Sequence, residues 1–493
     1  MSASKWGICL LPQSWRAGFR NGPLKSVLAV RLATARHAYP RRWNLGFYRP
    51  TVGKSAGTNH RIIVAIVGDL FFPRSAELGL PLEDTISPRV LAKVVYSGTA
   101  SAASFAASSR DLLKLSDLRI SSERVRRACH QTGHDRIADH DQLQADFLNM
   151  PLPWQSHGKP DGVRSPEIAC VMADGGRYQL LDRSVNARQR SARKGDHWKE
   201  SRIGLLASMS GEQHDCDPQP ELPPELRYRA IAQTLTEIGK TGAKQDDLNV
   251  DSEQEDRNGD GVVGPSLVSR AVVASRQNWE SFGPLLACQA WQRGFAASSR
   301  KVFVSDGSST IEKMQKRWFS HYTSVLDILH CFSYVLAAAR AITATEAEAQ
   351  AQYDDWAEKI WKGNAHIVIH ELLAHQRKHG LPPKDAKSDD PREVIRVSRV
   401  YLENHESRMD YPSYRKQGFP LVSSLMESMV KQVSRRVKGT EKYWSTDGSE
   451  AIIRLCGEYL CDHNPIDQHW ENRETNADGT RAYKTARSPA LNK

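Results

Sequence analysis

The sequence predicts an α/β protein in which a mixed sheet is flanked by helices and preceded by an all-α segment. Short apolar runs of strand length occur in "EIACVMAD", "SRIGLLASMS" and "KVFVSD". Stretches with apolar residues three or four positions apart, typical of helices, precede the first run and follow the last. This order predicts a helical domain over about residues 85–145 and an α/β domain over about 165–472.

Composition restricts the class of protein. The 493 residues allow two or three domains, and a hydrophobic fraction of 40% can form a sizeable core. No apolar run approaches the roughly 20 residues needed to cross a bilayer, so we expect a soluble, cytoplasmic protein with no membrane partner. The eight cysteines show no CxxC spacing, which is typical of reduced thiols. The net charge of +11 favours a polyanionic partner, with nucleic acid the leading candidate.

The first sixty residues are basic and contain no acid before Asp69. Three interpretations are open: a basic arm on DNA, an organelle transit peptide, or an extension upstream of the true start. Because the later motifs are prokaryotic in kind, we expect disorder or a misassigned start over residues 1–60. After Met1 the next methionine is Met150, so a start between them would need an alternative codon. We also expect a disordered tail over residues 473–493.

The segment "LLKLSDLRISSERVRRACHQTG" predicts a helix, a short turn and a second helix. Ser121 or Ser122 suits the N-cap of the second helix, and Glu123 suits its first turn. The second helix would expose three arginines, Arg124, Arg126 and Arg127. This is the layout of a helix-turn-helix whose second helix enters a major groove of DNA. A helical hairpin with solvated arginines accounts for the same residues equally well.

Three acids occur in a distinctive context. Asp174 ends "ACVMAD", Asp306 ends "KVFVSD", and Glu427 lies on the predicted amphipathic helix "LMESMVKQVSRR". Each aspartate is followed by glycine, which permits a sharp turn, and "DGGRYQ" is expected to form a Gly-Gly turn between two strands. Carboxylates brought together repel one another, and a divalent cation relieves the repulsion. Two Mg²⁺ ions held by such acids would support displacement at phosphorus.

Three longer motifs resemble the catalytic domain of DDE insertion-sequence transposases, in the ribonuclease-H-like clan that includes mutator-like elements. The first is "ADGGRYQ" followed by "DHWKESRIGLL", and the second is "VSDGSSTI" followed by "LDILHCFSYV". The third and most specific is "NHESRMDYPSYRKQGFPLVSSLMESMVKQVSRRVKGTEKYWS". The resemblance covers about Glu167 to Trp470. It implies a ribonuclease-H-like mixed sheet flanked by helices, with a variable, partly helical insertion over about residues 208–298.

The resemblance also implies an activity. Asp174, Asp306 and Glu427 match the family's catalytic, metal-binding triad, with Mg²⁺ as cofactor and Mn²⁺ as a substitute. The implied function is binding of terminal repeats, metal-dependent DNA cleavage and strand transfer by a homo-oligomer on double-stranded DNA, in a bacterial nucleoid. Two alternatives remain: a catalytically inactive DNA-binding relic, and a metal-dependent nuclease without strand transfer.

Several further residues are expected near DNA or near the acids. Asp327 and His330 match an acid-or-Cys and His feature of the family, with DNA positioning or helix structure as the open roles. His197 and Lys199 are expected to approach DNA or to order the strand edge. A cationic stripe is expected after Glu427, from Lys431, Arg435, Arg436 and Lys438. Many members of the resembled family carry Gly-Ser-Gly where this chain has Ser423, Ser424 and Leu425. Asp410 is expected in a turn.

Overall fold

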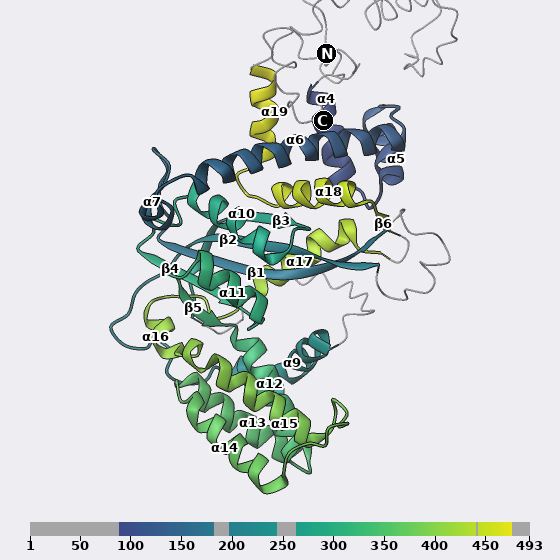
Figure 1. Cartoon of the computed structure of the whole chain (residues 1–493). Helices are drawn as coiled ribbons and strands as arrows, with labels where there is room; N and C mark the ends of the chain where they lie inside the picture. The colour runs from purple at the N-terminus through teal and green to yellow at the C-terminus, as the bar shows by residue number, and fades with distance from the viewer. Residues whose placement is uncertain (1–87, 182–196, 244–262, 440–441, 476–493) are drawn as a thin grey trace, which may run out of the picture. The chain divides into compact units, whose positions relative to one another are not determined.

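A six-stranded mixed sheet organises the residues that the computed structural model describes, which are 88–181, 197–243, 263–439 and 442–475 (Figure 1). Five strands lie in the order β3-β2-β1-β4-β5, and β6 pairs with the end of β1. β2 is antiparallel to β1 and β3, whereas β4, β5 and β6 run parallel to β1. The bounds are β1 Ile168–Leu180, β2 Trp198–Ser210, β3 Ser266–Ser275, β4 Arg300–Ser305, β5 Thr323–Leu326 and β6 Tyr443–Trp444. The predicted α/β class is confirmed.

β1 is one continuous strand, so the Gly-Gly turn expected inside it is wrong. Asp174 pairs with Ile203 and Gly175 with Arg202 in unbroken antiparallel register. The glycines serve a close approach of neighbouring side chains instead of a turn. A Cβ atom at Gly175 would collide with the carboxylate of Glu200. Asp174 therefore lies within β1 and not at its end.

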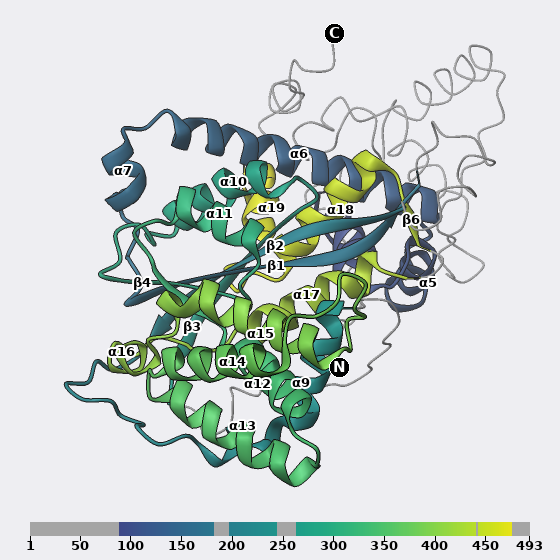
Figure 2. The same cartoon turned by 60° about the horizontal axis from the view of Figure 1, so that its bottom comes forward.

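Helices cover both faces of the sheet, and β1 alternates between two hydrophobic clusters. Ala169 and Val171 belong to the cluster formed with α10 (Trp279–Gln292) and α11 (Ser309–Trp318). Cys170 and Met172 belong to the larger cluster on the other face. That cluster includes residues of α12 (Ile328–Ile342), α17 (Ser424–Val437) and α18 (Thr446–Tyr459). Figure 2 shows the helices on either side of β1 and β2.

The remaining helices confirm the helical periodicity before and after the strands. They are α4 Pro88–Tyr96, α5 Phe105–Ser116, α6 Ser122–Leu148, α7 Leu152–His157, α9 Tyr228–Ala243, α13 Glu346–Trp361, α14 Ala365–His379, α15 Pro391–His405, α16 Tyr411–Lys416 and α19 Pro465–Thr475. The short helices are η1 Ser97–Ser101, η2 Pro224–Leu226 and η3 Glu406–Arg408. No helix among the described residues is long and apolar enough to cross a membrane.

The insertion and the chain ends differ in how the structure bears on their expected boundaries. The insertion expected over residues 208–298 contains β3 and α10, which belong to the sheet and its core, so its extent is corrected to the part between β2 and β3. The disorder expected over residues 1–60 and in most of the tail falls outside the described residues, whereas residues 473–475 complete α19.

The predicted helix, turn and helix are present as α5 and α6. Ser121 is the N-cap of α6, where its hydroxyl accepts a hydrogen bond from the amide of Arg124 at 3.3 Å. Asp117 ends α5 in the left-handed conformation, with φ of 55°. Leu112, Val125 and Cys129 belong to the same hydrophobic cluster as the sheet residues Met172 and Leu205. The two helices therefore share their core with the sheet.

The run "SRMDYPSY" has a structural role at the edge of the sheet. β5 is an edge strand, and its outward carbonyls need donors that are not supplied by a further strand. Arg408, Tyr411 and Tyr414 provide them, donating to the carbonyls of Val325 at 3.2 Å, Leu326 at 3.1 Å and Ser324 at 3.1 Å. Asp410 caps α16 by accepting from the amide of Ser413, as expected for a turn.

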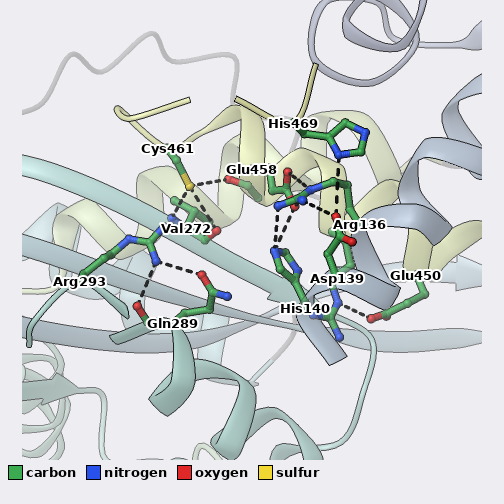
Figure 3. Close-up of polar contacts among 12 residues, drawn as sticks. Arg136, Asp139, His140, Val272, Gln289, Arg293, Glu450, Glu458, Cys461 and His469 are labelled. Carbon is green, nitrogen blue, oxygen red and sulfur yellow. Dashed lines mark hydrogen bonds and ion pairs between the residues drawn. The ribbon is translucent and has the colours of Figure 1, made fainter. Parts of the chain in front are cut away.

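A buried polar network connects α6 to α18 (Figure 3). Arg136 donates from Nε to both carboxylate oxygens of Glu458 at 2.9 Å and from Nη1 to Asp139 at 2.7 Å. Nε2 of His140 lies 3.2 Å from Glu458. On the neighbouring turn of α18, Arg454 donates to Glu450 at 2.6 Å. These contacts fix the 27-residue helix α6 against the sheet layer.

His140 should make the stability of the fold sensitive to acid. Burial, followed by the charge of Arg136, lowers the pKa of His140 from 6.5 to about 3. The unfolded chain therefore binds a proton more readily than the folded chain, and stability falls as pH decreases from about 6.5 toward about 3. In urea unfolding between pH 7 and pH 5, we expect His140→Gln to show a shallower loss of stability than the unaltered chain. The slope should decrease by up to about 1.4 kcal/mol per pH unit. Identical slopes would show that His140 does not titrate on unfolding.

Candidate active site

Two acids meet at the level where β1 and β4 lie side by side. In the parallel register Met172 is the partner of Val304, and Asp306 directly follows the end of β4 at Ser305. Extending the register by two residues places Asp306 near Asp174, in agreement with the effect of the Asp306 charge on the pKa of Asp174. Met172 and Val304 both belong to the larger hydrophobic cluster. Because side chains alternate along a strand, this register predicts that both carboxylates point to that same face.

Helix α17 brings the third acid to this face. The carbonyl of Gly439, just beyond α17, accepts a hydrogen bond from Gln179 near the end of β1. Ser434 on α17 lies beside Gly176, since a Cβ atom there would be 3.4 Å from the Ser434 hydroxyl. α17 therefore runs along β1 in the strand's direction. Glu427 precedes Ser434 by two helical turns, about 10 Å, on the same side of the helix, which brings it back to the level of Asp174.

The electrostatics agree with this geometry. Burial raises the pKa of Asp174 to about 7, and repulsion from Asp306 and Glu427 adds to the increase. Burial also raises the pKa of Glu427, with a contribution from the charge of Asp327. Asp174 accepts a hydrogen bond from the amide of Gly175 at 2.6 Å. The carboxylates of Asp306 and Glu427 are thus close enough to Asp174 for their charges to influence its titration.

The turn expected after Asp306 is present. Its carboxylate accepts from the amide of Ser308 at 2.9 Å, and its carbonyl accepts from the hydroxyl of Tyr401 at 2.7 Å. Gly307 has φ of +91°, and a Cβ atom there would lie 2.8 Å from the ring of His405. Only glycine allows the chain to pass between Asp306 and α15 in this way.

His330 supplies a positive charge beside the acids. It lies in the first turn of α12, and its Nδ1 is 3.6 Å from the buried carboxylate of Asp327. Burial alone would lower the pKa of His330, but Asp327, Asp306 and Glu427 together raise it to about 9. His330 is therefore protonated at neutral pH. It belongs to the acid site itself.

Asp327 links the start of α12 to the residue before α17, the helix that bears Glu427. The sequence left the role of Asp327 open. One carboxylate oxygen caps α12 by accepting from the amides of Leu329 at 2.7 Å and His330 at 3.2 Å. The other accepts from the amide of Ser423 at 2.7 Å and from its hydroxyl. Ser423 immediately precedes α17. The hydroxyl of Ser423 thus provides a hydrogen bond that a glycine at this position could not.

The cationic stripe on α17 contains three of its four expected residues. Lys431 and Arg435 are exposed, four residues apart and thus on one side of the helix, whereas Lys438 is partly exposed and follows the end of α17 in an extended conformation. The prediction for Arg436 is corrected, because its side chain is only 5% exposed. Its guanidinium donates to the carbonyl of Gly98 at 2.9 and 3.0 Å and packs over Phe105. This arginine holds α17 against η1 and α5.

The other residues expected to contact DNA lie on α6 and at the start of β2. Arg126 donates to Glu123 at 2.6 and 2.9 Å, so its charge is largely neutralised within α6. Arg127 is more exposed and 3.8 Å from the same glutamate, and Arg124 is partly buried. Lys199 is exposed on β2 opposite Tyr178, and His197 precedes it with its ring 5.9 Å from Tyr443. Both therefore lie at the β6 end of β1, where α17 also ends.

The carboxylates fit a hard divalent cation by donor chemistry, since oxygen ligands are the ones that Mg²⁺ prefers. The raised pKa of Asp174 indicates that its negative charge lacks full compensation in this structure. Even so, no group of three or more His, Cys, Asp and Glu side chains within the described part of the chain is arranged closely enough to hold a metal ion. The acids share one face and one level without forming a closed ligand set.

Comparisons with known proteins give no assignment: no family model matches the chain, and a search of curated proteins gives no significant match.

The Asp327 contacts should contribute strongly to stability. We expect Asp327→Ala to lower the free energy of unfolding by about 3 kcal/mol, because it removes the acceptor from buried donors and leaves His330 without its partner. Ser423→Ala removes one hydroxyl donor and should cost about 1 kcal/mol. Urea unfolding monitored by circular dichroism measures both. Asp390→Ala, which removes the partly exposed N-cap of α15, is the matched control and should cost less than Asp327→Ala. Equal losses at positions 327 and 390 would contradict the proposed role.

Proposed function

We propose that this protein is a DDE-type DNA transposase with a ribonuclease-H-like catalytic domain. The observation that carries the proposal is the register of β1 and β4, which brings Asp174 level with Asp306 on the face that α17 and Glu427 cover. The strand order, with β2 alone running against the others, supports the same assignment. The three sequence motifs that resemble this family contain these acids and the β5 edge.

The chemistry is metal-assisted hydrolysis and transfer at phosphorus. Asp174, Asp306 and Glu427 would hold Mg²⁺ or Mn²⁺, which when bound polarises the phosphate and lowers the pKa of the attacking oxygen. Asp306 is oriented by Ser308 and by the turn at Gly307. His330, protonated at neutral pH, offsets part of the negative charge beside the acids. Asp327 fixes the start of α17, and through it the position of Glu427.

Double-stranded DNA is the proposed partner. Lys431 and Arg435 are exposed on the helix that bears Glu427, and partly exposed Lys438 follows its end; together they could follow a phosphate backbone. In the proposal α5 and α6 bind the terminal repeats. Since both element ends must be cut and joined, the proposed protein acts as a homo-oligomer on DNA in the bacterial nucleoid. A nuclease without strand transfer uses the same acids and is the second candidate; a DNA-binding relic would keep the helices but not the activity.

The proposal is tested by cleavage and joining of a plasmid that carries the element's own ends, with Mg²⁺ or Mn²⁺. We expect the unaltered chain to cut and join, and Asp306→Asn and Glu427→Gln to reduce both activities by at least about a hundredfold while binding the ends normally. Glu403→Gln is the control, because this glutamate is 52% exposed on α15.

The possible outcomes separate the three functions. Cutting without joining by the unaltered chain would support the nuclease. Equal binding by all the variants with no cutting in either metal would support the relic. Full activity of Glu427→Gln would contradict the assignment of this helix to the active site.

A further inference from the structure

A polar pocket lies at β5, between this strand and α11, η3 and α16. Its volume is about 360 Å³, and its lining includes Glu312, Lys316, Thr323, Ser407, Arg408 and Tyr414. These residues come from α11, β5, η3 and α16. Most of its lining residues carry a polar or charged group, which suits a polar ligand.

Arg408 is an unusual lining residue because it is a buried cation, with 4% of its surface exposed. Its Nη2 donates to the Ser305 hydroxyl at 2.7 Å and to the carbonyl of Val325 at 3.2 Å. Its Nε and Nη1 groups have no hydrogen-bond partner in the described part of the chain. A buried guanidinium with two unsatisfied donor groups is costly unless an acceptor reaches it.

The surrounding groups favour an oxyanion as that acceptor. Lys316 is 73% exposed at the pocket, where its ammonium lies 2.6 Å from Glu312. Hydroxyls of Thr323 and Ser407 also line the space. An arginine fork, a mobile lysine and hydroxyl donors form a combination that recognises phosphate oxygens. Arg408 and Lys316 outnumber the single carboxylate of Glu312 among the charged lining residues.

We propose that this pocket binds a phosphate group through Arg408 and Lys316. Resting on the proposed function, the phosphate belongs to the DNA backbone, a short distance along the strand from the phosphate at the acids. Arg408 bonds to Ser305, which directly precedes Asp306, and alternation along β4 directs the Ser305 side chain to the face that α11 covers. Occupation of the pocket would hold one DNA strand in register with the catalytic carboxylates.

The first experiment uses inorganic phosphate with the full chain. Thermal unfolding is followed as phosphate replaces chloride at constant ionic strength. We expect phosphate to raise the midpoint saturably, and Lys316→Glu to weaken this binding at least about tenfold. Arg317→Glu is the matched control, with the same change of charge on the next residue of α11, where the side chain lies near Glu280 instead. Arg408→Gln should abolish the rise in the unfolding midpoint with phosphate. If Arg408→Gln does not fold, Lys316→Glu still tests the pocket.

A second experiment identifies the source of the phosphate. For a short DNA duplex, we expect Lys316→Glu to reduce the dependence of log binding constant on log salt by about one, with Arg317→Glu unchanged. Phosphate binding without this change in slope would overturn the DNA backbone as the source and leave a pocket for free phosphate. If phosphate and chloride act alike, or if both variants lose binding equally, the pocket itself is overturned while the cleavage test above stands. Phosphate binding by a chain that never binds DNA would support the pocket and contradict the proposed function.

Discussion

The buried carboxylate of Asp327 is the interaction on which the candidate site depends. It joins two segments almost a hundred residues apart, the start of α12 and the residue before α17. Burial alone would raise the pKa of Asp327, but His330 and the bonds from Ser423 lower it, so the carboxylate remains charged. β5 pairs with β4, the strand before Asp306, and leads into α12. The contacts of Asp327 with α12 and with Ser423 therefore fix α17 and its Glu427 relative to the strand before Asp306.

The sequence predicted what local patterns determine. Apolar runs that end in an acid located Asp174 and Asp306, and amphipathic spacing located α17. It failed where tertiary packing overrides a local signal. Gly175 and Gly176 favour a turn by type, yet the strand continues because Glu200 and its neighbours occupy the space that side chains would need.

Arg436 and β3 were missed for a related reason. Because Arg436 follows exposed Arg435, its sequence position suggests a place in the surface stripe. A rotation of 100° per residue instead places Arg436 on the buried side of α17, where it donates to the carbonyl of Gly98 and packs over Phe105. The first half of β3 is exposed and its second half buried, so the strand lacks a regular alternation. Both features depend on partners distant in sequence, which periodicity cannot identify.

The balance of charge around the acids is compatible with the proposed binding of DNA. Asp174, Asp306, Glu427 and Asp327 are four carboxyl groups around one cationic ring, that of His330, so the centre is negative and repels phosphate. Exposed cations lie on the helix that bears Glu427, at Lys431 and Arg435, and the buried cation Arg408 bonds to Ser305. Such an arrangement attracts a backbone to the flanks of the acids while the centre stays short of positive charge. That deficit favours cation binding between the carboxylates and the phosphate, which is the condition that metal-assisted transfer requires.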